Sequence, residues 1–266
     1  MKKSKGFKSR GAKPNSPPKE ASFHRTVIGI HGVMEALKVH PQWVQEVWLK
    51  EGAEDHPPLK NLLEKAKASK VSVKFLGPKR LDALGSGHQG VAAQLSKSPE
   101  FDERLLDSGG PGVCLALDQV TDPHNLGAIL RSAWLLGTRA IYVPEQRSAG
   151  LTPTVSKVAQ GGAEHVPVVV SSPLDQELKR LKDKGYWVFG LSHKGEKNLF
   201  EMDLPEKVVW VLGAEGAGLR KPVERACDEL VSIPQAEPSA SFNVSVAAGL
   251  ALAETHRQHF FSKASK

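Results

Sequence analysis

The chain has few cysteines and no residue pattern for a metal site. Only Cys114 and Cys227 occur among its 266 residues. Two cysteines cannot form a disulfide framework, and their scarcity is typical of a reducing compartment. They lie far apart in the sequence, and no pair of histidines accompanies them at zinc-ligand spacing. We therefore expect neither structural disulfides nor a bound metal.

Long apolar runs are also missing. The longest lie at 208–212 and 246–253, far short of the roughly 20 residues that span a bilayer. No apolar segment follows the charged N-terminus, so the sequence predicts no secretory signal. Apolar residues make up 40% and charged residues 24%, which is typical of a soluble globular protein and excludes a disordered chain, a collagen-like repeat and a coiled-coil rod. We expect a cytoplasmic protein without membrane contact.

The net charge of +7 is concentrated at one end of the chain. Residues 1–20 contain seven lysines and arginines and one glutamate, which leaves only +1 for residues 21–266. Such a segment buries too little apolar surface to fold alone, so residues 1–22 are predicted to form a disordered basic tail. Its composition fits two roles, an electrostatic arm for nucleic acid or a solubilising extension.

Hydrophobic periodicity divides the remaining chain into two α/β parts. Residues 23–96 alternate short strands with helices predicted at 32–40 and 59–68, which is typical of a small α/β module. Residues 97–112 contain Ser-Pro, several acidic residues and a Gly-Gly-Pro-Gly run, and are predicted to be a linker. In residues 113–266 strands alternate with helices, which predicts a mostly parallel sheet covered on both faces. Its strands are expected at 113–117, 140–143, 165–170, 186–191, 208–212 and 229–233.

The first candidate site is the loop DQVTDPHNLG at 118–127, directly after a predicted strand. Ligands of open α/β sheets bind beyond the carboxyl ends of the strands. Asn125 has two interpretations, a functional amide or the N-cap of the helix expected from 126 to 136. Arg131 lies inside that otherwise apolar helix. It is either half of an interfacial ion pair or a bidentate clamp for phosphate.

Two further loops follow predicted strands. LGAEGAGL at 212–219 matches neither the dinucleotide nor the Walker fingerprint. Glu215 within it would repel phosphate and instead suits hydrogen-bond donors. The third loop, SIPQAEPSASFNVS at 232–245, places Ser241 and Asn243 before an apolar helix expected to run to 261, and some of its polar residues are expected to cap that helix. No G-x-S-x-G elbow supports a serine hydrolase.

Taken together, the three loops resemble the signature motifs of the SpoU (TrmH) class of SPOUT methyltransferases. DQVTDPHNLGAILRSA, LGAEGAGL and IP-x6-SFNVSVAAG occur in the order and spacing of that class. GIHGV at 29–33 and HQGV at 88–91 resemble the amino-terminal part of its bacterial members that methylate guanosine in 23S rRNA. So do the segments that begin at Arg147, Lys157 and Gly162, and the likeness extends over residues 24–260.

The resemblance implies a fold and an activity. The expected fold is an α/β, parallel-sheet SPOUT methyltransferase domain with a deep trefoil knot at 113–266, preceded by a ribosomal-protein-like RNA-binding domain at 23–96. The implied reaction transfers a methyl group from S-adenosylmethionine to a ribose 2′-OH of RNA, and the implied assembly is a homodimer with the active site at the subunit interface. The class binds its cofactor largely through backbone around Gly213, Ile233 and Phe242. Its functional residues correspond here to Asn125, Arg131, Glu215, Ser241 and Asn243.

Elementary chemistry assigns provisional roles to these residues. Methyl transfer to a hydroxyl needs an in-line approach and loss of the hydroxyl proton, so positioning and a general base both contribute. Arg131 is the candidate base of the class, yet a guanidinium with a pKa above about 12 releases its proton at high cost. We therefore assign Arg131 first to clamping an RNA phosphate and the developing alkoxide. Ser241 and Asn243 are expected to orient the hydroxyl, and Glu215 to hold Asn125 or the motif loops in register.

One departure from the class keeps alternative functions open. Members usually carry Met and a nearby Gly after Ile-Pro, whereas this chain has Gln, Ala, Glu and Pro at 235–238. The change affects a turn expected near the cofactor. The leading prediction is a 23S rRNA 2′-O-methyltransferase. The alternatives are a tRNA or antibiotic-resistance rRNA methyltransferase and a non-catalytic RNA-binding member of the fold.

Overall fold

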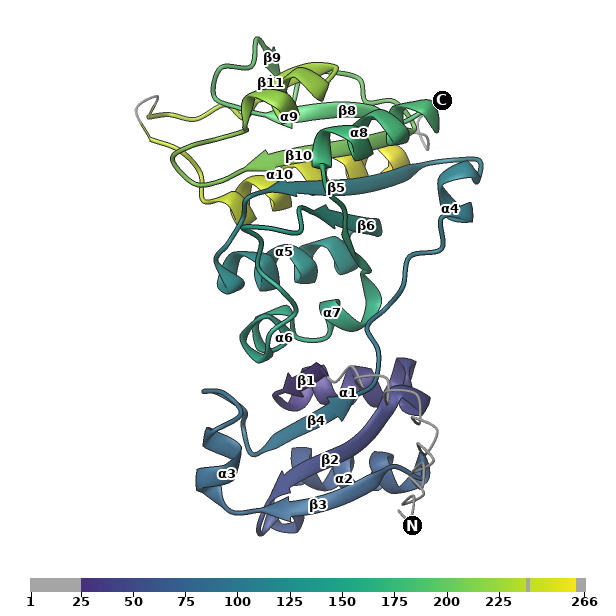
Figure 1. Cartoon of the computed structure of the whole chain (residues 1–266), viewed down its shortest axis with the longest axis vertical. Coiled ribbons are helices and arrows are strands. Elements are labelled where there is room, and N and C mark those ends of the chain that lie inside the picture. The colour runs from purple at the N-terminus through teal and green to yellow at the C-terminus, as the bar shows by residue number, and fades with distance from the viewer. Residues whose placement is uncertain (1–24, 238–239, 262–266) are drawn as a thin grey trace, which may run out of the picture.

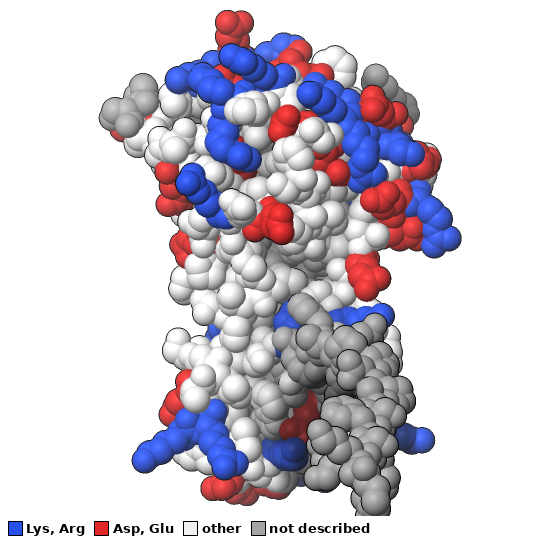
Figure 2. Space-filling model, in the orientation of Figure 1, with Lys and Arg blue, Asp and Glu red and all other residues white. Residues whose placement is uncertain are grey.

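The computed structural model describes residues 25–237 and 240–261, so the predicted basic tail at 1–22 lies outside the described residues. Two α/β domains are stacked along the long axis of the molecule and joined by one connecting segment (Figure 1). On the face drawn in Figure 2, Lys and Arg side chains are interspersed with Asp and Glu towards the two ends of the molecule, and the middle is mostly uncharged. This mixture agrees with a net charge of only +1 for residues 21–266.

The N-terminal domain is a four-stranded sheet in the order β1-β4-β2-β3, in which only β2 and β3 are parallel. Helices α1 and α2 supply Val33, Leu37, Leu62 and Ala66 to its core. The strands are β1 (Arg25–Ile28), β2 (Val44–Lys50), β3 (Ser72–Leu76) and β4 (Val91–Leu95). The helices are α1 (Ile30–Val39), α2 (Pro57–Ala68) and α3 (Pro78–Asp82), with single turns η1 (Pro41–Trp43) and η2 (Ala53–Asp55).

The C-terminal domain is a seven-stranded sheet in the order β7-β6-β5-β10-β8-β11-β9, and every strand pair in it is parallel. The predicted parallel α/β fold is thus confirmed. The central strands β5 and β10 are almost wholly apolar because both of their faces are covered. The strands are β5 (Gly112–Asp118), β6 (Thr138–Val143), β7 (Val168–Val170), β8 (Trp187–Leu191), β9 (Lys197–Asn198), β10 (Lys207–Gly213) and β11 (Glu229–Ser232).

Two layers of helices cover this sheet. Helices α5, α6 and α10 bury their apolar side chains in a core on one face, and α8 and α9 bury theirs on the other. The helices are α4 (Arg104–Asp107), α5 (Pro123–Leu135), α6 (Pro153–Ala159), α7 (Gly162–His165), α8 (Leu174–Asp183), α9 (Lys221–Ala226), α10 (Val244–His256) and the π-helical turn η3 (Arg257–Phe261).

The structure differs from the expected elements in several places. Strand β9 and helix α3 were not expected, and the expected strand at 165–170 is reduced to β7 because α7 occupies its start. The single-turn helix α4 in the predicted linker is compatible with the sequence prediction, which allowed one helical turn there. Helix α7 follows Gly161, which has φ of 104°, and Gly162 packs directly on the backbone of α5 at Leu130. The helix expected from 244 to 261 ends at His256, and η3 follows it.

A buried polar contact joins the two domains. Arg25 of β1 forms an ion pair with Glu164 of α7, and both side chains are almost fully buried. His40 Nε2 bonds to the Glu164 carbonyl oxygen at 2.9 Å, and His165 Nε2 bonds to Glu35 at 3.0 Å. Burial raises the pKa of Glu164 even though Arg25 opposes that shift. The orientation of the N-terminal domain is therefore set by specific contacts as well as by the connecting segment.

The described residues contain neither a membrane-spanning helix nor a metal-binding cluster. No helix there is long and apolar enough to cross a membrane. No group of three or more His, Cys, Asp or Glu in the described ranges is arranged to hold a metal ion. The trefoil knot stays a prediction.

Candidate active site

The site begins where β10 ends in a closed glycine turn. Gly218 N donates a hydrogen bond to the Ala214 carbonyl at 2.8 Å, which folds residues 214–218 back on themselves. A Cβ at Gly213 would lie 2.1 Å from the carbonyl carbon of Gly218, so only glycine fits there. The turn presents Glu215 at its exposed tip. Glu215 is thus held at the carboxyl edge of the sheet, where ligands of such folds bind.

Asn125 faces this turn from inside helix α5. Asp122 caps that helix by accepting a hydrogen bond from His124 N at 2.9 Å, and Pro123 occupies its first position. The interpretation of Asn125 as the N-cap was therefore wrong. Asn125 is 7% exposed, and its Nδ2 donates to Glu215 Oε1 at 3.1 Å. Because Asp122 caps the helix, the buried amide of Asn125 is available to hold Glu215.

Asn243 joins the same cluster from the start of helix α10. It caps that helix, because its Oδ1 accepts from Ser245 N at 2.9 Å and from Ser245 Oγ at 2.6 Å. Its Nδ2 donates to Glu215 Oε1 at 2.7 Å and to Asn125 Oδ1 at 2.9 Å. Three segments distant in the sequence thus meet in one hydrogen-bond network.

The bonding capacity of these groups shows which atoms are open to a ligand. An Asn side chain has two N–H donors and an oxygen that accepts about two bonds. Asn243 uses all of this capacity within the protein. Among the described residues, no hydrogen bond reaches Glu215 Oε2 or uses the second N–H of Asn125. The expectation that Asn243 itself orients a substrate hydroxyl is therefore less favoured than a positioning role.

Asp118 is a supporting residue to which sequence reasoning gave no role. It is fully buried at the end of β5 and accepts from Arg220 N at 2.8 Å and Arg220 Nε at 2.6 Å. Arg220 directly follows the glycine turn, so this ion pair ties the end of the turn to β5. A single carboxylate at the end of an otherwise apolar strand was the sequence signal for it.

A cavity of about 370 Å³ opens beside the glycine turn. Its size lies within the roughly 300–1,000 Å³ usual for small-molecule sites. The three residues predicted to contact a cofactor, Gly213, Ile233 and Phe242, all line it, together with Glu215 and Ser241. Apolar side chains from β8, β10, β11 and α10 form its walls, and the turn supplies backbone polar groups. The cavity suits a ligand with a flat apolar part and several hydrogen-bonding groups.

Arg131 does not join this cluster within one chain. It is exposed on α5, six residues after Asn125, which corresponds to about 9 Å along a helix. In the part of the chain that the structure describes, it makes no hydrogen bond or ion pair with Asn125, Glu215 or Asn243. The structure brings together four of the five predicted catalytic residues and leaves Arg131 apart.

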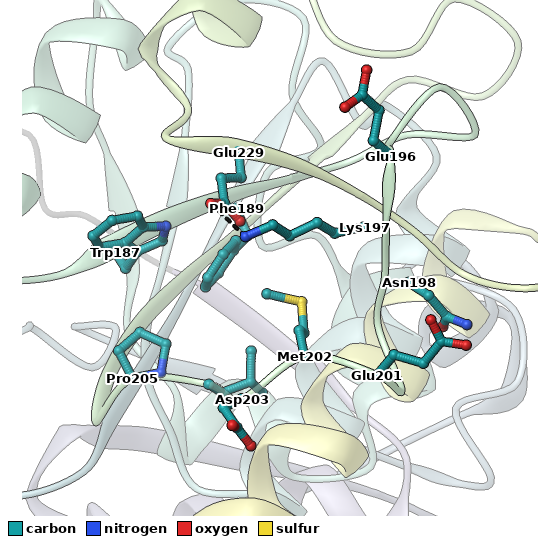
Figure 3. Close-up of a pocket in the computed structure, with 11 residues that line it drawn as sticks. Trp187, Phe189, Glu196, Lys197, Asn198, Glu201, Met202, Asp203, Pro205 and Glu229 are labelled. Carbon is teal, nitrogen blue, oxygen red and sulfur yellow. Dashed lines mark hydrogen bonds and ion pairs between the residues drawn. The ribbon is translucent and has the colours of Figure 1, made fainter.

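A larger cavity lies elsewhere in the C-terminal domain. It measures about 800 Å³ and is lined by residues of β8, β9, β11 and the segment before β10. Figure 3 shows Trp187 and Phe189 beside the Lys197–Glu229 ion pair that bridges β9 and β11. None of the predicted catalytic or cofactor residues lines it. This cavity is the larger of the two, but Glu215 of the hydrogen-bond network lines the smaller one.

Comparison with known families finds matches to both domains of the chain. The SpoU rRNA Methylase family matches residues 112–253, and the family described as RNA 2′-O ribose methyltransferase substrate binding matches residues 26–101. The second match corresponds to the four-stranded N-terminal domain with the start of the connecting segment, and the first to the parallel-sheet domain that carries the cluster.

Individual relatives extend the similarity over most of the chain. The 23S rRNA (guanosine-2′-O-)-methyltransferase RlmB of Pseudomonas syringae pv. tomato is 42% identical over 238 residues, which are 87% of this chain and 95% of that protein. RlmB of Neisseria meningitidis serogroup B is 41% identical over 239 residues, 88% of this chain and 95% of the relative. The solved SpoU methyltransferase AviRb from Streptomyces viridochromogenes in complex with AdoMet has a TM-score of 0.76 at 24% identity, covering 90% of this chain and 91% of that one, and shows the shared fold.

Proposed function

The chain belongs to the SpoU rRNA methylase family, and on that premise we propose that it transfers a methyl group from S-adenosylmethionine to the 2′-OH of a guanosine in 23S rRNA. The Asn125–Glu215–Asn243 network at the mouth of the glycine-turn cavity carries this proposal. A non-catalytic RNA-binding protein has no need of two amides, that of buried Asn125 and that of exposed Asn243, which together fix one carboxylate at the edge of a cavity. The network therefore disfavours that alternative.

The residues of the cavity fit S-adenosylmethionine. Backbone of the glycine turn and of the segment around Ile233 offers hydrogen bonds, and Phe242 and the aliphatic walls suit an adenine ring. Gln235, in the segment that departs from the class, donates to the carbonyls of Glu237 and Ala240 at 3.0 and 2.6 Å. These bonds hold the backbone there without the usual glycine. When bound, the cofactor supplies an electrophilic methyl group on a sulfonium.

The chain's own residues supply the positioning. Glu215 Oε1 accepts hydrogen bonds from the amides of Asn125 and Asn243 and so fixes both side chains. Among the described residues, the second N–H of Asn125 and Oε2 of Glu215 have no protein partner and are open to the substrate. Ser241 lines the same cavity as Glu215, and its hydroxyl is proposed to contact the ribose. Orientation of this kind contributes several kcal/mol to lowering a transfer barrier. Asn125, Glu215 and Ser241 are thus the proposed substrate contacts, and Asn243 is a positioning residue.

The proposal that 23S rRNA is the target rests on the N-terminal domain and on the relatives. The N-terminal domain, proposed to comprise residues 23–96, is the RNA-binding part, 97–112 is the linker, and 113–266 is the methyltransferase domain. The relatives that match over both domains are named for guanosine in 23S rRNA. A tRNA target or a resistance-conferring rRNA target is the second candidate. The extra domain disfavours a tRNA enzyme built from the methyltransferase domain alone.

A homodimer would complete the site. Helix α10 buries Ala248 and Leu252 against the sheet, while Val246 is 48% exposed and Ala253 is also exposed. A helix that is apolar on both sides is expected to be covered on both sides. We assign that cover to a second copy, and we place Arg131 of one protomer at the cluster of its partner. This arrangement explains why Arg131 is exposed and apart from Glu215 in a single chain.

The decisive experiment compares ribose methylation in total RNA from a wild-type strain and from a strain that lacks this gene. We expect the loss of a single 2′-O-methylguanosine in 23S rRNA. Purified protein with S-adenosylmethionine should restore it on rRNA from the deletion strain. Loss of a tRNA modification instead would establish the second candidate, and an unchanged methylation map would refute both.

A further inference from the structure

Lys157 of helix α6 extends out of the C-terminal domain and into the N-terminal domain. A Cβ placed on Gly29, directly after β1, would lie 3.0 Å from Lys157 Cδ and 3.3 Å from its Nζ. A Cβ on Gly87, in the loop before β4, would lie 3.5 Å from Lys157 Cε. Figure 1 shows α6 between α5 and β1. The ammonium group is therefore located at the junction of the two domains, beside two glycine-containing loops.

Glycines in these two loops leave space for the lysine side chain. Gly29 has φ of 89°, a conformation that residues with a Cβ rarely adopt. Gln89 holds the two loops together, because its Oε1 accepts a hydrogen bond from Ile30 N at 3.2 Å. His31 and Gln89 are both exposed next to this point. The junction thus has one cation and two exposed groups able to hydrogen-bond.

Lys157 has no counter-charge in the part of the chain that the structure describes. Among the described residues, no carboxylate forms an ion pair with it, and partial burial lowers its pKa. Two other partly buried lysines, Lys182 and Lys207, are compensated. Lys182 pairs with Asp228 at 2.8 Å, and Lys207 donates to two backbone carbonyls and lies over the Tyr186 ring. A partly desolvated cation without such partners is suited to an anion from outside the protein.

The position of Lys157 also relates it to the methyl-transfer site. Its neighbour Val158 packs against Gly127, where a Cβ would lie 2.6 Å away, and Gly127 is two residues from Asn125. Helix α6, which carries Lys157, is therefore packed directly on the helix that carries Asn125. We propose that Lys157, flanked by His31 and Gln89, binds a backbone phosphate of the RNA where the strand crosses between the domains. This proposal rests on the proposed RNA-methylating function and adds a phosphate site to it.

The test measures how RNA affinity depends on salt. Lys157→Met and Lys157→Gln both remove the charge, Lys157→Arg keeps it, and Lys179→Met removes an exposed lysine on α8, across the sheet from α6. The probe is a 23S rRNA transcript. Loss of one phosphate contact should reduce the slope of log affinity against log salt by about 0.7–0.9. Between about 50 and 200 mM salt this corresponds to roughly a threefold smaller loss of affinity.

We expect the smaller slope in both neutral variants, the wild-type slope in Lys157→Arg and Lys179→Met, and unchanged S-adenosylmethionine binding in all four. Methylation should show a raised KM for RNA with kcat retained. A wild-type slope in both neutral variants that fold would overturn the phosphate site, even if the wild-type enzyme methylates rRNA. A Lys157-dependent slope in a protein that methylates no RNA would uphold the phosphate site and refute the proposed function.

Discussion

Asn243 Nδ2 donates to Glu215 Oε1 at 2.7 Å, which links the start of the last helix to the tip of the glycine turn. The same oxygen accepts from Asn125, so one carboxylate atom fixes two amides. Glu215→Gln keeps an acceptor oxygen in that place, whereas Glu215→Ala removes it. We expect kcat to fall about 100-fold in Glu215→Ala, the usual cost of losing alignment by about 1 Å, and less than about tenfold in Glu215→Gln.

The rate of single-turnover methylation of rRNA is measured for both variants at saturating cofactor. Calorimetry measures their affinity for S-adenosylmethionine in parallel, so that a change in rate can be distinguished from a change in cofactor binding. Asn125→Ala should resemble Glu215→Ala, since it removes the buried member of the network. If Glu215→Gln is as inactive as Glu215→Ala, the contribution of Glu215 depends on its charge and not only on an acceptor oxygen that fixes the two amides.

Arg131 offers a test of the composite dimer. Arg131→Ala and Asn125→Ala should each be inactive alone. If Arg131 acts on the partner's cluster, a mixed dimer of the two variants contains one intact site. Statistical mixing in equal amounts then restores up to about one quarter of wild-type activity, because half of the dimers are mixed and each has one good site of two.

The variants are mixed under conditions that exchange subunits, and light scattering confirms the dimer. A mixture that stays inactive after proven exchange would place Arg131 in the site of its own chain. Val246→Asp, on the exposed side of α10, should give monomers with little activity, whereas a fully active monomer contradicts the dimer.

Gly213 should be irreplaceable for cofactor binding. Gly213→Ala places a methyl group 2.1 Å from the carbonyl carbon of Gly218, so the turn has to open and the cavity changes shape. We expect S-adenosylmethionine affinity to fall at least about tenfold, equivalent to about 1.4 kcal/mol. Gly150→Ala is the matched control because a Cβ there meets no atom within 4 Å. Equal affinity in both variants, measured by calorimetry, would remove the glycine turn from the cofactor site.

The sequence predicted the strands of the parallel sheet well because a strand covered on both faces is a continuous apolar run, as in β5 and β10. Sequence patterns were weaker where a contact joins distant segments. Arg25 and Glu164 are 139 residues apart, and neither has a local pattern that signals the other. The N-cap of α5 was misassigned although Asp122 precedes Pro123, an order that itself indicates a helix start. Arg131 is a different case: the resemblance to the class singles it out, whereas the single chain leaves it apart from the cluster, and its role at a partner's site stays a proposal.

The Arg25–Glu164 pair should stabilise the joined domains. Arg25→Met leaves the Glu164 carboxylate buried without its cation, and such a loss costs about 3–5 kcal/mol. The double variant Arg25→Met with Glu164→Leu removes both charges and should lose less. Urea unfolding of the two variants and the wild type gives the comparison. A double variant that is less stable than Arg25→Met would show that the Glu164 side chain stabilises the interface by more than its pairing with Arg25.

The basic tail is expected to add RNA affinity without changing the target. Residues 1–20 carry +6 of the net charge, and phosphate contacts strengthen binding while base contacts specify it. If about four tail cations contact phosphates, deletion of residues 1–20 should reduce the salt slope by roughly 3, well above the effect of Lys157 alone. Affinity at about 50 and 200 mM salt and the methylated nucleotide are measured for both proteins. An unchanged slope would make the tail a solubilising extension, and a changed nucleotide would mean that the tail itself reads the RNA.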